Sequence, residues 1–216
     1  AAYSHRPIGS HSPLCAFSFH PNKNMTTGEG GMVTGTDGGL LQKVRKLRYH
    51  GIERSAYETR HSPRHYNVLV PGYKLNMTDL AAALGLGQLR KVQAFNSKRR
   101  ELAAGYRGRL SEFPIYLPSE ETREGAIHAM HLFTIRVQDE PGLRDRTMKY
   151  LLSEGIETGL HYLPVHTMRA MRTFASKCGL PETEKVGRTV MSLPLFPEMT
   201  EEQLDQVAAA LGSFLT

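Results

Sequence analysis

The segment from Cys15 to Thr36 constrains the fold most, because it places a polar, glycine-rich loop between two short apolar runs. Residues 15–19 are apolar and aromatic, the chain breaks at Pro21, and an apolar pattern resumes over residues 31–36. Short apolar runs bounded by turn residues are typical of buried strands. The sequence therefore predicts a strand, a loop and a second strand, and a hydrophobic content of 40% excludes a disordered chain.

One lysine, Lys23, lies in this loop among serine and threonine hydroxyls and glycine amides. A loop of this kind directly after a buried strand can hydrogen-bond an anion such as phosphate. Partial desolvation between hydrophobic strands favours the neutral amine of a lysine, which attacks an aldehyde or ketone to form a Schiff base. The alternative is an ordinary solvent-exposed turn lysine, since the loop matches no Walker phosphate-binding motif.

Downstream of this segment, apolar residues at helical spacing predict an amphipathic helix over about residues 40–49, which Gly51 ends. Residues 51–71 are polar and show no period, so we expect a long surface loop there.

A second helix is expected from Thr78-Asp79, which can cap it, to about Gln93. Gly85 and Gly87 lie inside this helix, where each costs about 1 kcal/mol relative to alanine. The glycines therefore indicate close packing against another element. Another helix is expected after Asn96-Ser97, and we place a domain boundary near residue 95.

Beyond residue 95 the pattern predicts a small α/β domain over residues 96–216. Its expected strands are residues 131–137 and 156–163, and its expected helices are residues 143–154, 168–177 and 182–190, followed by a last helix from residue 200. Thr200 and Gln203 have the spacing of a capping box at the start of that last helix.

Charge is distributed unevenly along the chain. The formal net charge is +6, but residues 1–110 carry 17 basic and 6 acidic side chains, whereas residues 111–216 carry 10 and 15. This asymmetry favours a first half that meets anions. A nucleic-acid partner is not expected, because the basic residues have helical spacing without interleaved aromatics and form no known motif. The alternative is that these charges lie on solvated helix faces.

Composition excludes further classes of protein. The longest nearly uninterrupted apolar run, residues 80–86, is far shorter than the about 20 residues that span a bilayer. Cys15 and Cys178 are too few for a disulfide framework and indicate a reducing, cytoplasmic compartment, where we expect both to be small buried apolar residues. The chain begins at Ala1 with neither an initiator methionine nor a signal peptide, so we expect a fragment.

The loop segment resembles the lysine segment of the DegT/StrS sugar-nucleotide aminotransferases, enzymes of pyridoxal-phosphate (PLP) fold type I. Their pattern, roughly F-S-F-H-x-x-K-x-x-T-x-G-E-G-G, matches residues 17–31, and the family's second segment matches residues 71–89. Further matches follow in the family's order at residues 99–106, 128–133, 158–162 and 192–197. The resemblance thus covers essentially the whole chain.

The resemblance implies a fold and a function. The fold would be the C-terminal part of a fold-type I transferase, with residues 1–95 from the end of the large PLP-binding domain and residues 96–216 as the small domain. The reaction would transfer an amino group from glutamate or glutamine to a keto-sugar nucleotide, for lipopolysaccharide or other amino-sugar biosynthesis. Details at residues 71–76, 158–161 and 193–200 are most similar to the UDP-4-amino-4-deoxy-L-arabinose–oxoglutarate aminotransferases.

The resemblance also implies site residues in a homodimer whose active sites lie at the subunit interface. Lys23 would form the Schiff base with PLP and then move the proton between substrate and cofactor. Ser18 would bind the PLP phosphate, and Asn76 would reach that phosphate from the neighbouring subunit, although many relatives have their asparagine where this chain has Lys74. His161, His50 and Lys74 are candidates to face the substrate, with a structural role as the alternative for each histidine.

In the family, an aspartate that pairs with the pyridine nitrogen, an aromatic that stacks on the ring and a phosphate-binding turn all precede the point that matches Ala1. We therefore expect that this polypeptide alone does not transaminate, because the electron sink needs that aspartate. The alternative function is a non-catalytic remnant or dimerising binding module of the same fold.

Overall fold

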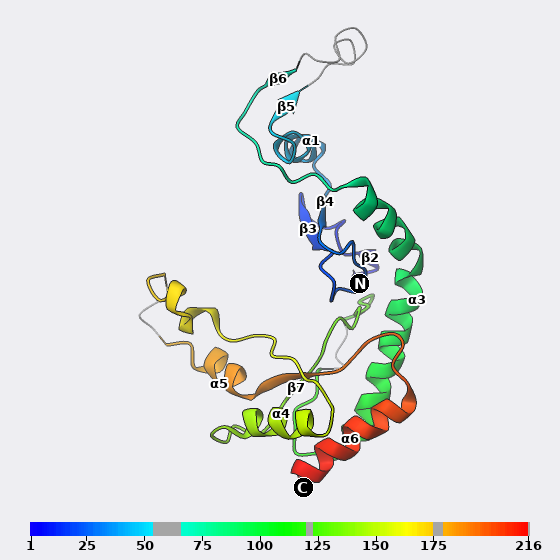
Figure 1. The fold of residues 1–216 in the computed structure, drawn as a ribbon, viewed down its shortest axis with the longest axis vertical. Helices are drawn as coiled ribbons and strands as arrows, with labels where there is room; N and C mark the ends of the chain where they lie inside the picture. Colours follow the sequence, from blue (N-terminus) through cyan, green and yellow to red (C-terminus); the bar gives the residue numbers. More distant parts are fainter. Residues whose placement is uncertain (54–65, 120–122, 175–178, 216) are drawn as a thin grey trace. The chain divides into compact units, whose positions relative to one another are not determined.

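A computed structural model describes residues 1–53, 66–119, 123–174 and 179–215. The chain divides into two compact units, of which the first holds residues 1–93 and 122–128 and the second holds residues 94–121 and 129–216. Figure 1 shows the helices and strands of both units in the order of the sequence. No helix of the described residues is both long and apolar enough to cross a membrane.

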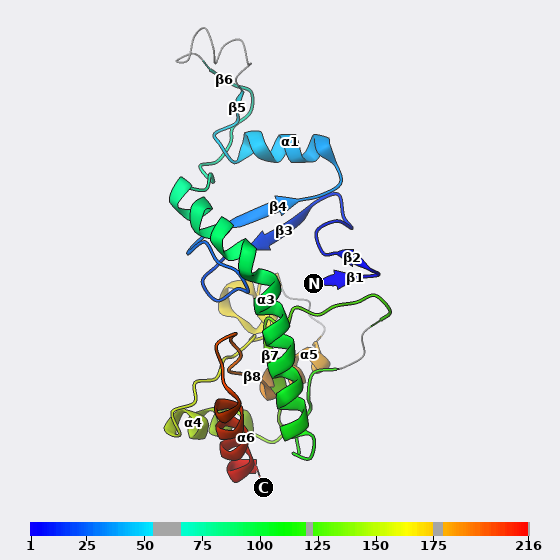
Figure 2. The same ribbon diagram turned by 90° about the vertical axis from the view of Figure 1, so that its right-hand side faces the viewer.

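The described residues of the first unit form three antiparallel strand pairs. They are β1 (Ala2–Tyr3) with β2 (Arg6–Pro7), β3 (Cys15–Ser18) with β4 (Gly31–Thr34), and β5 (Ile52–Glu53) with β6 (Asn67–Val68). The predicted strand, loop and strand are confirmed, because β3 and β4 pair in a register that joins Cys15 to Thr34 and Ser18 to Gly31. Figure 2 shows these two strands side by side.

Helix α1 (Gly38–Leu47) follows β4 and is the amphipathic helix that the sequence predicts. Asp37 caps its start, where the side-chain oxygen accepts a hydrogen bond from the Leu40 amide at 2.9 Å. Gly51 follows its end with φ +70°, and a Cβ there would lie 1.8 Å from the Val70 carbonyl oxygen, so only glycine fits. The predicted loop over residues 51–71 includes β5 and β6, and residues 54–65 lie outside the described residues.

Helix α3 (Asp79–Leu110) is one continuous helix, which corrects the prediction of two helices separated at Asn96-Ser97. Thr78 caps its start as predicted, since the Thr78 hydroxyl accepts a hydrogen bond from the Ala81 amide at 3.2 Å. The second predicted cap does not form. Asn96 is buried, and the Ser97 hydroxyl accepts from the Arg100 guanidinium at 3.1 Å, so tertiary packing overrides the local preference of both residues for a helix start.

The two glycines of α3 have different surroundings. Gly85 is buried, and a Cβ there would lie 2.8 Å from the Thr27 side-chain carbon Cγ2, whereas a Cβ at Gly87 would have nothing within 4 Å. Close packing against another element is therefore confirmed for Gly85 and wrong for Gly87.

This difference makes the two glycines a matched pair for mutation. We expect Gly85→Ala to destabilise the packing of α3 on the lysine loop by about 1–3 kcal/mol, because the branched Thr27 side chain has little freedom to move. Gly87→Ala should instead stabilise the helix by about 0.5–1 kcal/mol. Hydrogen exchange at the Thr27 amide measures the effect, and equal exchange rates in the two variants would contradict the expectation.

The second unit contains one strand pair, β7 (Phe133–Arg136) with β8 (Val190–Leu193), in antiparallel register. Around it lie the C-terminal part of α3, α4 (Leu143–Ser153), α5 (Pro181–Thr189) and α6 (Glu201–Leu215). The helices predicted at residues 143–154, at 182–190 and from residue 200 are confirmed.

Two predictions for the second unit need correction, and one of its strands was not predicted. Residues 156–163 form no regular strand, and only Gly159 pairs with β8, through an isolated bridge to Ser192. Strand β8, at residues 190–193 directly after α5, was not predicted. In place of a helix over residues 168–177, the described part forms one short 3-10 turn, η2 (Arg169–Met171), which follows another such turn, η1 (Val165–Thr167). Residues 175–177 lie outside the described residues.

The hydrophobic core belongs to the second unit. Among the described residues, every buried apolar side chain lies there, and the first unit buries none. Tyr106 of α3 and Phe133 of β7 stack at its centre, with ring centroids 4.9 Å apart. The Tyr106 hydroxyl donates to the Pro194 carbonyl at 2.9 Å, and burial raises the pKa of this phenol well above its usual value. Burial of apolar area thus holds the second unit together.

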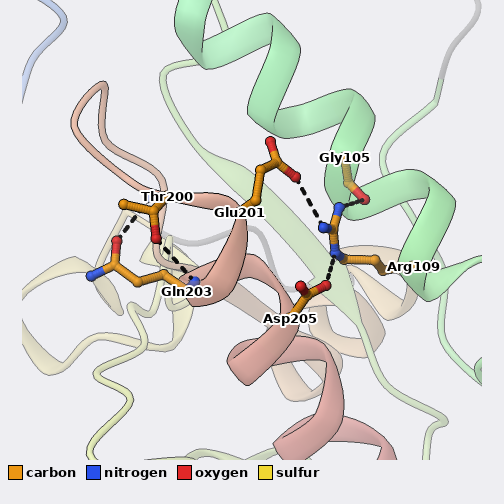
Figure 3. Close-up of polar contacts among 6 residues, drawn as sticks. All are labelled: Gly105, Arg109, Thr200, Glu201, Gln203 and Asp205. Carbon is orange, nitrogen blue, oxygen red and sulfur yellow. Dashed lines mark hydrogen bonds and ion pairs between the residues drawn. The ribbon is translucent and has the colours of Figure 1, made fainter.

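Polar contacts join α3 and α6 at the edge of this core (Figure 3). The Arg109 guanidinium donates to the Glu201 and Asp205 carboxylates at 2.9 and 2.6 Å. The predicted capping box is confirmed, because the Thr200 amide donates to Gln203 at 3.0 Å and the Gln203 amide donates to the Thr200 hydroxyl at 3.3 Å. These bonds fix where α6 begins.

Candidate functional site

The loop that carries Lys23 is closed at its base by the two strands. Ser18 and Gly31 pair across β3 and β4, and the next residue, Phe19, donates its amide hydrogen to the Gly30 carbonyl at 2.9 Å. The Thr27 amide donates to the Phe19 carbonyl at 3.0 Å. The loop that contains Lys23 therefore begins and ends at neighbouring points, because its first and last residues are hydrogen-bonded to each other.

Lys23 lies in a tight turn within that excursion and is half-buried. Its amide donates to the His20 carbonyl at 3.0 Å, which fixes the backbone from which the amine extends. The lysine is therefore held by an ordered backbone. This is what a reaction at a single amine requires, because a well-placed nucleophile avoids the entropic cost of finding its target.

The hydroxyls of this loop have different roles. The sequence suggested that serine and threonine side chains together bind an anion, but Thr26 and Thr27 donate within the loop, to the carbonyls of Phe19 and Glu29 at 3.0 and 2.8 Å. The Thr26 hydroxyl also accepts from the Gly28 amide at 2.9 Å. Both threonines therefore shape the loop.

Ser18 is exposed at the end of β3, and its hydroxyl accepts a hydrogen bond from the His20 amide at 3.3 Å. Accepting leaves the hydroxyl hydrogen available to donate. This arrangement fits the role that the family resemblance implies, donation to a phosphate oxygen. The predicted role of Ser18 stays a prediction.

Thr27 is a residue whose importance the sequence did not reveal. It is 5% exposed, its hydroxyl would lie 2.3 Å from a Cβ at Gly30, and its methyl group packs where Gly85 leaves space on α3. Met77 also approaches Gly30 closely. The glycines at positions 30 and 85 are the only sequence signal of this contact, which docks the lysine loop on the start of α3.

Asn76 lies near the lysine loop, because its neighbour in the chain, Met77, approaches Gly30 of that loop. Its side-chain oxygen is buried and has no hydrogen-bond partner among the described residues. A buried unpaired acceptor is unfavourable unless a donor is supplied. The oxygen suits a hydroxyl or N–H group of a ligand or another chain, and the nitrogen of the same amide can donate to a phosphate. The role of Asn76 at the cofactor phosphate of the neighbouring subunit stays a prediction.

Lys74 and His50 form a second group around Tyr49. The Lys74 ammonium nitrogen lies 4.9 Å from the centre of the Tyr49 ring, and the Tyr49 and His50 rings are 5.4 Å apart. A backbone bridge joins Tyr49 to Lys74, and the His50 amide donates to the Tyr73 carbonyl at 2.9 Å. The structure thus brings together two of the predicted substrate residues in an exposed aromatic and basic cluster.

His161 belongs to the second unit. Its Nδ1 atom lies 2.8 Å from the Ser192 hydroxyl oxygen, and its ring meets the edge of Tyr162 with centroids 4.8 Å apart. The ring is half-buried. A substrate-facing role for His161 stays a prediction.

Both cysteines were expected to be small buried apolar residues. Cys15 is half-buried and unbonded to another cysteine, and Cys178 lies outside the described residues. The described residues contain no group of three or more histidine, cysteine, aspartate or glutamate side chains that could hold a metal ion. The exposed Glu29 takes part in the loop through its carbonyl.

Known structures are similar to this chain over almost its whole length. Spr1654 of Streptococcus pneumoniae, described as a sugar aminotransferase and solved in its PMP form, is 26% identical with a TM-score of 0.92 over 99% of this chain and 55% of its own. DesV of S. venezuelae is 32% identical, with a TM-score of 0.85 over 99% of this chain and 54% of its own. The sugar aminotransferase CalS13 of Micromonospora echinospora is 26% identical, with a TM-score of 0.84 over 98% and 55%.

These similarities confirm the α/β fold expected from the sequence. The chain spans about half the length of the structures that it matches. A family model of aminotransferases matches residues 1–212, which include the lysine loop, the Asn76 segment and His161. With 212 of its 216 residues matched, the chain belongs to the DegT/DnrJ/EryC1/StrS aminotransferase family.

Proposed function

We propose that this chain carries the lysine of a PLP-dependent aminotransferase that transfers an amino group from glutamate or glutamine to a keto-sugar nucleotide. The observation that carries the proposal is the closed loop between β3 and β4, which holds Lys23 at its turn. Membership of the aminotransferase family and the similarity to sugar aminotransferases support it.

Three residues, Ser18, Lys23 and Asn76, have distinct roles in the proposed site. Ser18 would donate to the phosphate of the cofactor, and the Asn76 amide would reach that phosphate from the neighbouring subunit. The Lys23 amine would hold the cofactor covalently, and once freed it would carry the proton to and from the substrate carbon. When bound, PLP supplies the electron sink that makes loss of this proton possible.

The proposed substrate class is supported by the cluster of Tyr49, His50 and Lys74. An ammonium group over an exposed aromatic ring, next to an imidazole, offers both a stacking surface and cationic donors. A sugar nucleotide combines a flat base with a diphosphate, which are the two features that such a cluster binds. The excess of basic side chains in residues 1–110 likewise favours a negatively charged ligand such as a diphosphate.

Activity is proposed to need more protein than these 216 residues, in a homodimer with its sites at the subunit interface. Large apolar side chains of the first unit are exposed, among them Leu80 at 86%, Leu75 at 70% and Tyr73 at 65%. Exposed apolar surface of this kind indicates a partner. The lipopolysaccharide role and the similarity to UDP-4-amino-4-deoxy-L-arabinose–oxoglutarate aminotransferases stay predictions.

The test is an assay of amino transfer with PLP, glutamate or glutamine, and a panel of keto-sugar nucleotides. We expect no turnover by the 216-residue chain alone. Turnover should appear when it is co-expressed with a polypeptide matching the part of its relatives that it does not cover. Turnover by the chain alone would contradict the proposed need for more protein. No turnover in either case, with both polypeptides folded, would favour the non-catalytic binding module.

A further inference from the structure

Ser192 lies at a position where its side chain has almost no freedom. It is 3% exposed at the middle of the β7 and β8 pair, where its register partner is Thr134. On the other side, two backbone hydrogen bonds of 2.8 and 2.9 Å join it to Gly159. The backbone of Ser192 is therefore held on both sides, and burial leaves its side chain little room.

The Ser192 hydroxyl contacts the imidazole of His161, with 2.8 Å between its oxygen and Nδ1. The ring lies directly over Gly159, since a Cβ at this glycine would be 2.5 Å from the ring carbon Cε1 and 3.0 Å from Nδ1. Glycine is therefore the residue that lets the ring reach Ser192. The edge of the Tyr162 ring, 4.8 Å away between centroids, restrains the imidazole further.

The contact between Ser192 and His161 can be made in two ways, with either the hydroxyl or Nδ1 as donor. If Nδ1 carried the hydrogen, the buried hydroxyl would keep a hydrogen with no acceptor among the described residues, and a buried unsatisfied donor is costly. Donation from Ser192 to Nδ1 satisfies both groups. The neutral imidazole then carries its hydrogen on Nε2, the ring nitrogen that no described residue engages in a hydrogen bond.

We propose that Ser192 is a positioning residue that keeps His161 in the tautomer with its hydrogen on Nε2, so that His161 offers an N–H donor to an acceptor oxygen of the substrate. The part that concerns the substrate rests on the proposed function, whereas the tautomer does not. His161 is thus assigned as a donor in binding, a role different from that of Lys23, which moves the proton.

The tautomer is measured directly by long-range ¹H–¹⁵N correlation spectra of the ¹⁵N-labelled 216-residue chain. The spectra are recorded at a pH of about 8.5, roughly two units above the ordinary pKa of a histidine side chain, about 6.5. The signals of His161 are identified by their loss in His161→Gln. We expect Nε2 to be the protonated nitrogen, and we expect Ser192→Ala to lower the ratio of the two tautomers by about tenfold, as the loss of one hydrogen bond implies.

Two further measurements separate positioning from a general loss of structure. His166, whose Nε2 lies 3.2 Å from the Glu184 carboxylate in the same unit, should keep its signals in Ser192→Ala. Gly159→Ala pushes the ring off the glycine while Ser192 stays in place, so it should cause the same loss of tautomer preference and replaces Ser192→Ala if that variant does not fold.

Protonation of Nδ1 in the wild-type chain would overturn the inference, as would an unchanged ratio in the variants. Either result leaves the proposed function standing, because amino transfer is assayed separately. Conversely, a complete enzyme that fails to transfer amino groups while its His161 shows the expected tautomer would remove the proposed function and leave the positioning role of Ser192.

Discussion

Lys23→Ala is expected to abolish amino transfer in the complete enzyme, with a fall in kcat of about 10⁴-fold or more. The proposed role combines a covalent attachment with the movement of a proton, and general acid–base catalysis by one side chain alone contributes about 10²–10⁴-fold. Lys23→Arg should fail equally, because a guanidinium keeps the positive charge but supplies no neutral amine.

The same substitution has a readout that does not depend on turnover. When the protein is treated with PLP and then with borohydride, mass spectrometry should find the reduced cofactor on Lys23, and the label should disappear in Lys23→Ala. Lys43→Ala is the matched control, since Lys43 is exposed on α1 and should leave both labelling and turnover unchanged. A label that persists in Lys23→Ala, or that lies on many lysines equally, would remove the central residue of the proposed function.

Phe133→Ala is expected to lower the free energy of unfolding by about 3–5 kcal/mol, the range typical of removing a buried aromatic side chain. Phe133 is fully buried in β7 and stacks on Tyr106. Domains of ordinary stability unfold at a cost of about 5–15 kcal/mol, so this loss removes a large share of the total. Denaturant unfolding followed by far-UV circular dichroism measures the difference.

Phe174→Ala provides the control, because it removes the same ring from a site in the same unit where the side chain is 83% exposed. Its effect should stay within about 0.5 kcal/mol. A loss of similar size in both variants would mean that the core does not lie where β7 and α3 place it. The pair therefore tests the assignment of the hydrophobic core to the second unit.

The local elements follow closely from sequence signals that act over a few residues. The strands beside the lysine loop, the start of α3 at Thr78 and the capping box of α6 were all predicted, because each depends on neighbouring side chains and backbone groups. The family was recognised for a similar reason, since its motifs are contiguous in the chain. The order of residues 17–31 is visible without any structure.

Contacts between distant segments were decided only by the tertiary structure. Asn96-Ser97 has the composition of a helix start, but packing of the second unit carries α3 through it as one helix. Strand β8 pairs with β7, which lies far away in the sequence, and the contact between Ser192 and His161 joins residues 31 positions apart. The buried Thr27 meets Gly85 across 58 positions. Periodicity and capping describe energies between neighbours in the chain, whereas burial depends on which surfaces meet after folding. The sequence by itself therefore determined most of the local elements and the position of the lysine. The tertiary structure decided the continuity of α3, the strand β8 and the contacts between distant segments.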